Sequence, residues 1–137
     1  MLVHIMLALI VDDDPVCRSM LCAALKRHGT PTAVASGREA VEAVRNALLA
    51  DQPFDLITLD IMMPDMNGQA ALVSIRSLEA VKGIPAGSGA KVLMTTAMGD
   101  GKNVLNAFRE QCNGYLIKPI DLEKLYLELS KQGLITL

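Results

Sequence analysis

Short apolar runs alternate with amphipathic stretches along this chain of 137 residues. Five runs have the length and composition of β-strands, namely residues 5–11, 31–35, 55–59, 91–96 and 114–117. Apolar residues at helical spacing follow each run, over about 15–27, 36–50, 69–78, 101–112 and 121–131. Because parallel strands need a crossover connection, usually a helix, this alternation predicts an α/β fold with helices on both faces of a parallel sheet. The length predicts one domain spanning residues 1–137.

Local signals support several of these boundaries. Pro15 suits the first turn of the first helix, and Gly29 lies where that helix should end. The residues from Ser36 to Glu39 have the spacing of a capping box at the start of the second helix. Residues 81–90 contain three glycines and one proline, so we interpret them as a mobile surface loop, inserted away from any site.

The composition argues against several classes of protein. Aromatic residues make up 3% of the chain and the net charge is −2, which disfavours direct nucleic-acid binding. The three cysteines lack metal-binding spacing and are expected to be reduced and buried. The apolar N-terminus has no basic segment or cleavage site and is shorter than the roughly 20 residues that span a bilayer. We therefore expect a cytoplasmic protein without membrane insertion.

Polar side chains stand at the carboxyl ends of four of the five predicted strands. They are Asp12, Asp13 and Asp14 after the first, Asp60 in the third, Thr96 in the fourth and Lys118 after the fifth. Ligands of open α/β sheets bind at this edge. Converging carboxylates favour a hard cation such as Mg²⁺. A carboxylate beside that cation can act as a nucleophile toward a phosphoryl donor, with a lysine and a hydroxyl group stabilising the phosphoryl oxygens.

Each of these residues also has a plainer interpretation. Asp14 stands before Pro15 and is expected to be a helix cap. Asp60 would also suit a turn, and Lys118 taken alone would suit a solvated surface position. Thr96 carries little weight by itself, because threonine is common in strands. Only their combination at one edge of the sheet points to phosphoryl chemistry.

Four segments resemble the signature motifs of response regulator receiver domains, the chemotaxis-regulator family. They are LIVDDDP (9–15), ITLDIMMPDMNG (57–68), VLMTTA (92–97) and GYLIKPI (114–120). They occur in the order and approximate spacing of that family and cover nearly the whole chain. The resemblance implies a flavodoxin-like (βα)5 three-layer sandwich whose five parallel strands have the order 2-1-3-4-5.

The resemblance also implies a role for each matching residue. Asp60 would be the phosphoacceptor, receiving a phosphoryl group from a phosphohistidine of a sensor histidine kinase or a histidine phosphotransfer protein. Asp13, Asp60 and the main-chain carbonyl of Met62 would ligate Mg²⁺ directly, and Asp12 would act mainly through a metal-bound water. Lys118 would stabilise the phosphoryl group.

Further implied features concern signalling and the surroundings of the phosphoryl group. The peptide bond between Lys118 and Pro119 is expected to be cis. Thr96 and Tyr115 match the switch pair that remodels the protein-binding face. Met62 and Met98 would flank the site together with Pro119, and we expect the two apolar methionine side chains to shield the acyl phosphate from water.

This interpretation describes a signalling phosphoacceptor that catalyses only its own phosphorylation and dephosphorylation, rather than an enzyme. We expect no output domain in this chain, and its downstream target would be a protein that the sequence does not identify. One alternative is a receiver domain excised from a larger kinase or transcription regulator. A flavin-binding electron carrier lacks support, because no Ser/Thr/Gly-rich phosphate loop follows the first strand. A phosphohydrolase using Asp12 and Asp14 would need a cap insertion that is absent from the sequence.

Overall fold

The computed structural model describes residues 4–97 and 111–137. Its centre is a parallel sheet of five strands in the order β2-β1-β3-β4-β5. The strands are β1 (Met6–Val11), β2 (Gly29–Val34), β3 (Leu56–Asp60), β4 (Lys91–Thr96) and β5 (Gly114–Ile117). The three inner strands are almost entirely buried, as their apolar sequences require. The predicted fold class and strand order are confirmed.

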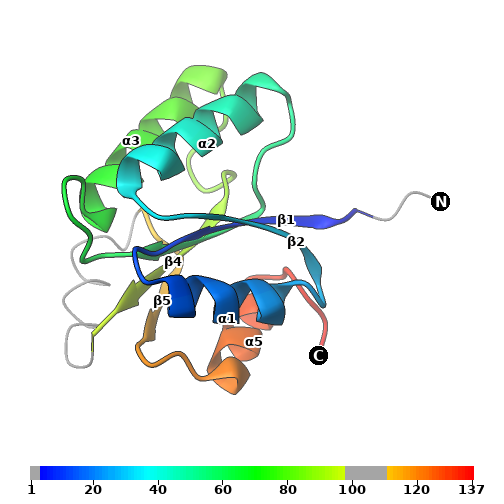
Figure 1. The fold of residues 1–137 in the computed structure, drawn as a ribbon. Coiled ribbons are helices and arrows are strands. Elements are labelled where there is room, and N and C mark those ends of the chain that lie inside the picture. The colour runs from blue at the N-terminus through cyan, green and yellow to red at the C-terminus, as the bar shows by residue number, and fades with distance from the viewer. Residues whose placement is uncertain (1–3, 98–110) are drawn as a thin grey trace.

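Four helices lie within the described residues and cover both faces of the sheet. They are α1 (Pro15–Leu25), α2 (Gly37–Leu49), α3 (Gly68–Lys82) and α5 (Leu122–Lys131). Figure 1 shows α2 and α3 on one face and α1 and α5 on the other, which gives three layers. The helix expected over 101–112 falls mainly outside the described residues. None of the described helices is long and apolar enough to cross a membrane.

Side-chain caps explain where α1 and α2 begin. The Asp14 carboxylate accepts a hydrogen bond from Val16 N at 3.0 Å, so the predicted cap is confirmed. Ser36 Oγ accepts from Glu39 N at 3.2 Å, and the Glu39 carboxylate accepts from Ala35 N at 3.1 Å. Ser36 therefore caps α2, and Glu39 bonds the backbone of the residue before the cap instead of the N–H of Ser36 that a capping box would use.

The third helix is longer than the sequence pattern indicated. It extends to Lys82 instead of ending near Leu78, and Gly83 closes it with a φ of +93°. The apolar periodicity stops early because Val81 faces solvent and the buried position of the last turn is the polar Glu79. Residues 81 and 82 therefore belong to the helix rather than to the glycine-rich loop.

Two apolar clusters, one on each face of the sheet, form the core. The first joins β1, β3 and β4 to α2 and α3 and includes the buried Cys112. The second joins the other face of the sheet to α1 and α5, with the half-buried Cys17 and Cys22 at its margin. All three cysteines are free, as expected, although only Cys112 is fully buried. These clusters leave the carboxyl edge of the sheet as the place where polar groups gather.

Candidate functional site

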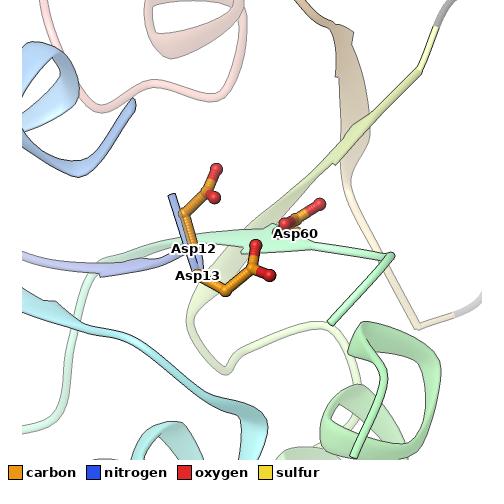
Figure 2. Close-up of side chains that lie close together, drawn as sticks. All are labelled: Asp12, Asp13 and Asp60. Carbon is orange, nitrogen blue, oxygen red and sulfur yellow. The ribbon is translucent and has the colours of Figure 1, made fainter. Parts of the chain in front are cut away.

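Three carboxylates meet where β1 and β3 end. These neighbouring strands run in parallel with Val11 opposite Leu59, so Asp12 and Asp60 emerge side by side. One carboxylate oxygen from each of Asp12, Asp13 and Asp60 lies within 4.8 Å of the others. Figure 2 shows the three side chains around one space at the strand ends. The structure therefore brings together the acids that the sequence placed at one edge.

A single ammonium group partly neutralises this cluster. Lys118 Nζ lies 2.9 Å from Asp12 Oδ2 and 3.2 Å from Asp60 Oδ2. Asp12 and Asp60 are only 1% and 3% exposed, whereas Asp13 faces solvent. A buried carboxylate without a partner is costly, so the lysine is required by the two buried acids before any ligand is considered.

The backbone of β5 delivers Lys118 to the acids. Lys118 N donates to the Thr96 carbonyl at 2.8 Å, which continues the pairing of β4 with β5 beyond Ile117. The Lys118–Pro119 peptide is cis, as expected. Thr96 is buried at the end of β4, and the half-buried Tyr115 lies on the neighbouring strand. Their positions match the expectation, while their role as a switch pair stays a prediction.

Burial and charge act differently on the two buried acids. Burial opposes the ionisation of Asp12, but Lys118, the Asp14 N–H and the Cys17 thiol together hold the pKa of Asp12 below its ordinary value. Burial and the neighbouring charge of Asp12 raise the pKa of Asp60 to about 6, against the opposing effect of Lys118. Asp60 is therefore ionised at neutral pH at an energetic cost, and Asp12 without one.

Contacts within the β1–α1 connection hold Asp12 in place. Asp14 N donates to Asp12 Oδ1 at 2.9 Å, and Arg18 Nη1 donates to the Asp12 carbonyl at 2.8 Å. Burial and Asp12 raise the pKa of Cys17 to about 12, so its thiol remains a proton donor. Sequence reasoning missed Arg18 and Cys17. One signal was available, because a cation in the first turn of a helix is unfavourable unless it has a specific partner.

Gly68 is a third residue whose role the sequence did not reveal. It begins α3 directly behind the acid at the end of β3, and its N–H donates to the Ile61 carbonyl at 3.0 Å. A Cβ atom at Gly68 would stand 2.2 Å from the Asp60 carbonyl oxygen. The turn from Asp60 into α3 therefore closes only with glycine at this position.

The residues expected to flank the site are only partly placed. The Met62 side chain is 77% exposed, and Pro119 is also exposed. Met98 lies outside the described residues. The proposed shielding by Met62 and Met98 stays a prediction, as does a metal contact from the Met62 carbonyl.

The donor set fits a hard divalent cation. Three carboxylates face one ammonium group, which leaves an excess of negative charge. Asp12 Oδ2 is buried, and its contact with Lys118 does not have the geometry of a hydrogen bond. Oxygen ligands with free lone pairs and uncompensated charge are what Mg²⁺ prefers. The structure thus supports a metal site formed by Asp12, Asp13 and Asp60.

Comparisons with known proteins agree with this geometry. Residues 8–130 match the family described as response regulator receiver domain. The transcriptional regulatory protein ZraR of Escherichia coli K12 is 37% identical over 124 residues, or 90% of this chain and 25% of that protein. The chemotaxis protein CheY of Bacillus subtilis is 29% identical over 123 residues, covering 90% of this chain and 93% of CheY.

A solved structure of a receiver domain has a similar fold. It is the Saccharomyces cerevisiae co-crystal structure of the histidine phosphotransfer protein Ypd1 with the receiver domain of the response regulator Ssk1. The match has a TM-score of 0.77 at 25% identity, covering 93% of this chain and 88% of that chain. The chain covers nearly all of CheY, but it spans only between 25% and 46% of the length of the first curated relatives.

The raised pKa of Asp60 predicts that Asp60→Asn stabilises the metal-free protein at pH 7.5. The pKa rises from an ordinary 3.8 to about 6, so the stability associated with protonated Asp60 is lost as the pH increases through 6. The substitution removes this penalty and should add about 2 to 3 kcal/mol to the free energy of unfolding. Urea unfolding should show this gain shrinking as the pH falls below 6 and vanishing below about pH 3, where Asp60 is protonated in both states. A variant less stable than the wild type at pH 7.5 would contradict the account.

The close approach at Gly68 predicts that Gly68→Ala is destabilising. The added Cβ would collide with the Asp60 carbonyl, which belongs to the backbone and cannot rotate away. We expect a loss of about 1 to 3 kcal/mol in the free energy of unfolding, the usual effect of overpacking. Gly87→Ala serves for comparison because it introduces no steric clash: nothing lies within 4 Å of a Cβ at that position. Any loss of stability in this variant comes from backbone strain at its φ of +88°. Equal stability of Gly68→Ala and the wild type would refute the steric argument.

Proposed function

Because the chain belongs to the response regulator receiver domain family, we propose that Asp60 accepts a phosphoryl group from a phosphohistidine. The observation that carries this proposal is the Asp60 carboxylate itself. It is buried at the end of β3, grouped with two further acids, and in contact with the Lys118 ammonium group. No other described carboxylate combines these features with a pKa raised to about 6.

The transfer itself requires little covalent chemistry from the protein. An Asp60 carboxylate oxygen attacks phosphorus, the phosphorus–nitrogen bond of the donor breaks, and the imidazole leaves with the bonding electrons. The products are an acyl phosphate on Asp60 and a free histidine on the donor. Lys118 Nζ lies 3.2 Å from Asp60 Oδ2, and we propose that it pairs with the negatively charged phosphoryl oxygens once Asp60 is phosphorylated. The Thr96 hydroxyl is proposed to donate a hydrogen bond to them.

Asp12, Asp13 and Asp60 would hold Mg²⁺, with the Met62 carbonyl as a further ligand. When bound, the cation neutralises negative charge on the carboxylates and on the phosphoryl oxygens. The exposed Asp13 is the member of the set that solvent reaches most directly, while Asp12 is held by Asp14 N and Arg18. These acids therefore form a preorganised anionic cradle.

The proposed partners are proteins. The donor would be a sensor histidine kinase or a histidine phosphotransfer protein, supported by the likeness to the Ssk1 receiver domain solved with Ypd1. The output would be a shift between two conformations, in which Thr96 and Tyr115 respond to the phosphoryl group and change a protein-binding face. The chain would thus be a signalling phosphoacceptor that modifies only itself. The relative ZraR is a longer protein, of which the matched part makes up 25%.

Phosphorylation is tested by incubating the protein with a small acyl-phosphate donor and Mg²⁺ and measuring its intact mass. We expect one added phosphoryl group on the wild type and none on Asp60→Asn. Asp65→Asn is the matched control, because Asp65 is an exposed acid in the next loop whose φ of +67° asparagine tolerates. This control should label like the wild type. Labelling that survives Asp60→Asn, or a wild type that never labels, would refute the proposal.

A further inference from the structure

Lys118 directly follows β5, a strand with hydrogen-bonded contacts to β4 at both of its ends. β5 has four residues, lies at the edge of the sheet, and pairs only with β4. At its carboxyl end, Lys118 N donates to the Thr96 carbonyl at 2.8 Å. At its amino end stands Asn113. A short edge strand with one neighbour has few ladder hydrogen bonds, so backbone contacts at its ends add to the hydrophobic pattern in setting its register.

Asn113 binds β4 through both its backbone and its side chain. Its N–H donates to the Val92 carbonyl at 2.8 Å, and its Oδ1 accepts from Val92 N at 2.8 Å. Val92 is completely buried, and among the described residues Asn113 supplies the partner of its N–H. The Asn113 carbonyl also accepts from Gln132 Nε2 at 3.0 Å, just after α5. One side chain thus sets where β5 begins against β4.

Arg76 on α3 also holds the Asn113 side chain. This helix covers the face of the sheet opposite to α5 (Figure 1). Arg76 Nη2 donates to Asn113 Oδ1 at 3.3 Å, and Arg76 Nε donates to the Gln111 carbonyl at 2.8 Å. The guanidinium is itself anchored to Glu79 Oε1 at 2.7 Å and to the Ala90 carbonyl at 2.9 Å. Because every nitrogen of this guanidinium has a partner, Arg76 provides a rigid support.

The end of the glycine-rich loop packs against Glu79, the partner of Arg76. Ala90 N donates to Glu79 Oε2 at 2.8 Å, and a Cβ at Gly89 would lie 2.2 Å from the same oxygen. A side chain at residue 89 would therefore displace the Glu79 carboxylate from this contact. A segment that the sequence marked as a surface insertion is thus tied at its end to the residues that hold Asn113.

We propose that Asn113 is a positioning residue for Lys118, which it places by fixing the register of β5. The pairing runs without interruption from Gly114 opposite Leu93 to Ile117 opposite Thr96, directly before Lys118. A displacement at the start of the strand is therefore passed to its end. This inference rests on the proposed function, because it concerns the approach of Lys118 Nζ to the phosphoacceptor Asp60.

The topology separates this role from a general effect on folding. The acids that would hold Mg²⁺ lie at the ends of β1 and β3, whereas Asn113 contacts β4, α3 and the residue that follows α5. Loss of the Asn113 side chain should therefore disturb Lys118 and leave the metal site intact. If Asn113 only stabilised the fold, its loss would lower the labelling rate and the Mg²⁺ affinity together.

The experiment compares Asn113→Ala with the wild type in three measurements. They are the rate of Asp60 labelling by a small acyl phosphate, Mg²⁺ affinity by calorimetry, and hydrogen exchange of the Lys118 amide. We expect labelling to slow by roughly tenfold, in line with the sensitivity of transfer reactions to misplaced groups. The Lys118 amide should exchange faster, while Mg²⁺ affinity stays within about twofold of the wild type.

Three variants serve as comparisons. Asn113→Asp keeps the acceptor for Val92 N and the partner for Arg76, so it should restore wild-type labelling. Gln132→Ala removes a contact with the same residue but not one that sets the register, and it should label normally. Asn113→Gln keeps an amide but moves it by one methylene, and it should label slowly even if Asn113→Ala fails to fold.

Folded Asn113→Ala or Asn113→Gln that label at the wild-type rate would overturn the inference. A parallel loss of Mg²⁺ affinity and labelling rate would also overturn it, because the effect would then be general. A wild type that does not label at all would instead refute the proposed function. In that case, exchange of the Lys118 amide would still report whether Asn113 holds the end of β5.

Discussion

The ammonium group of Lys118 between two buried carboxylates is the interaction on which the site depends. Asp12 and Asp60 are nearly inaccessible to water and stand at the ends of adjacent strands, and a third acid lies beside them. Without the contacts of 2.9 Å and 3.2 Å to Lys118, this edge of the sheet would hold uncompensated buried charge. Even with them, negative charge remains in excess. That excess makes the edge of the sheet receptive to a divalent cation, and burial together with the charge of Asp12 keeps the pKa of Asp60 high.

Several backbone features serve this one arrangement. Gly68 lets α3 begin directly behind Asp60, and Arg18 binds the carbonyl of Asp12. Asn113 and the cis peptide before Pro119 stand at opposite ends of the segment that carries Lys118. The charges are thus positioned by contacts that side chains of different elements make to the backbone, and by a close approach at Gly68. Such preorganisation suits phosphoryl transfer, in which catalysis consists largely of placing charge.

Much of the fold could be predicted from the sequence because its signals are local. The apolar runs marked the strands, Asp14 and Ser36 marked helix starts, and the strand ends located Asp12 and Asp60. The end of α3 was misplaced because a polar residue is buried in its last turn, where apolar periodicity carries no information. The long-range contacts of the site, such as Val92 with Asn113, join residues far apart in the chain and have no local signature. The opposite pKa shifts of Asp12 and Asp60 likewise arise only from three-dimensional burial and charge.

Of the three clustered acids, Asp60 is the one that we expect to form the acyl phosphate. The most direct measurement treats the phosphorylated protein with borohydride, which reduces an aspartyl phosphate to homoserine, and then sequences the peptides by mass spectrometry. We expect homoserine at position 60, with Asp12 and Asp13 recovered unchanged. Homoserine at position 12 or 13, or phosphate on a residue outside this cluster, would contradict this expectation.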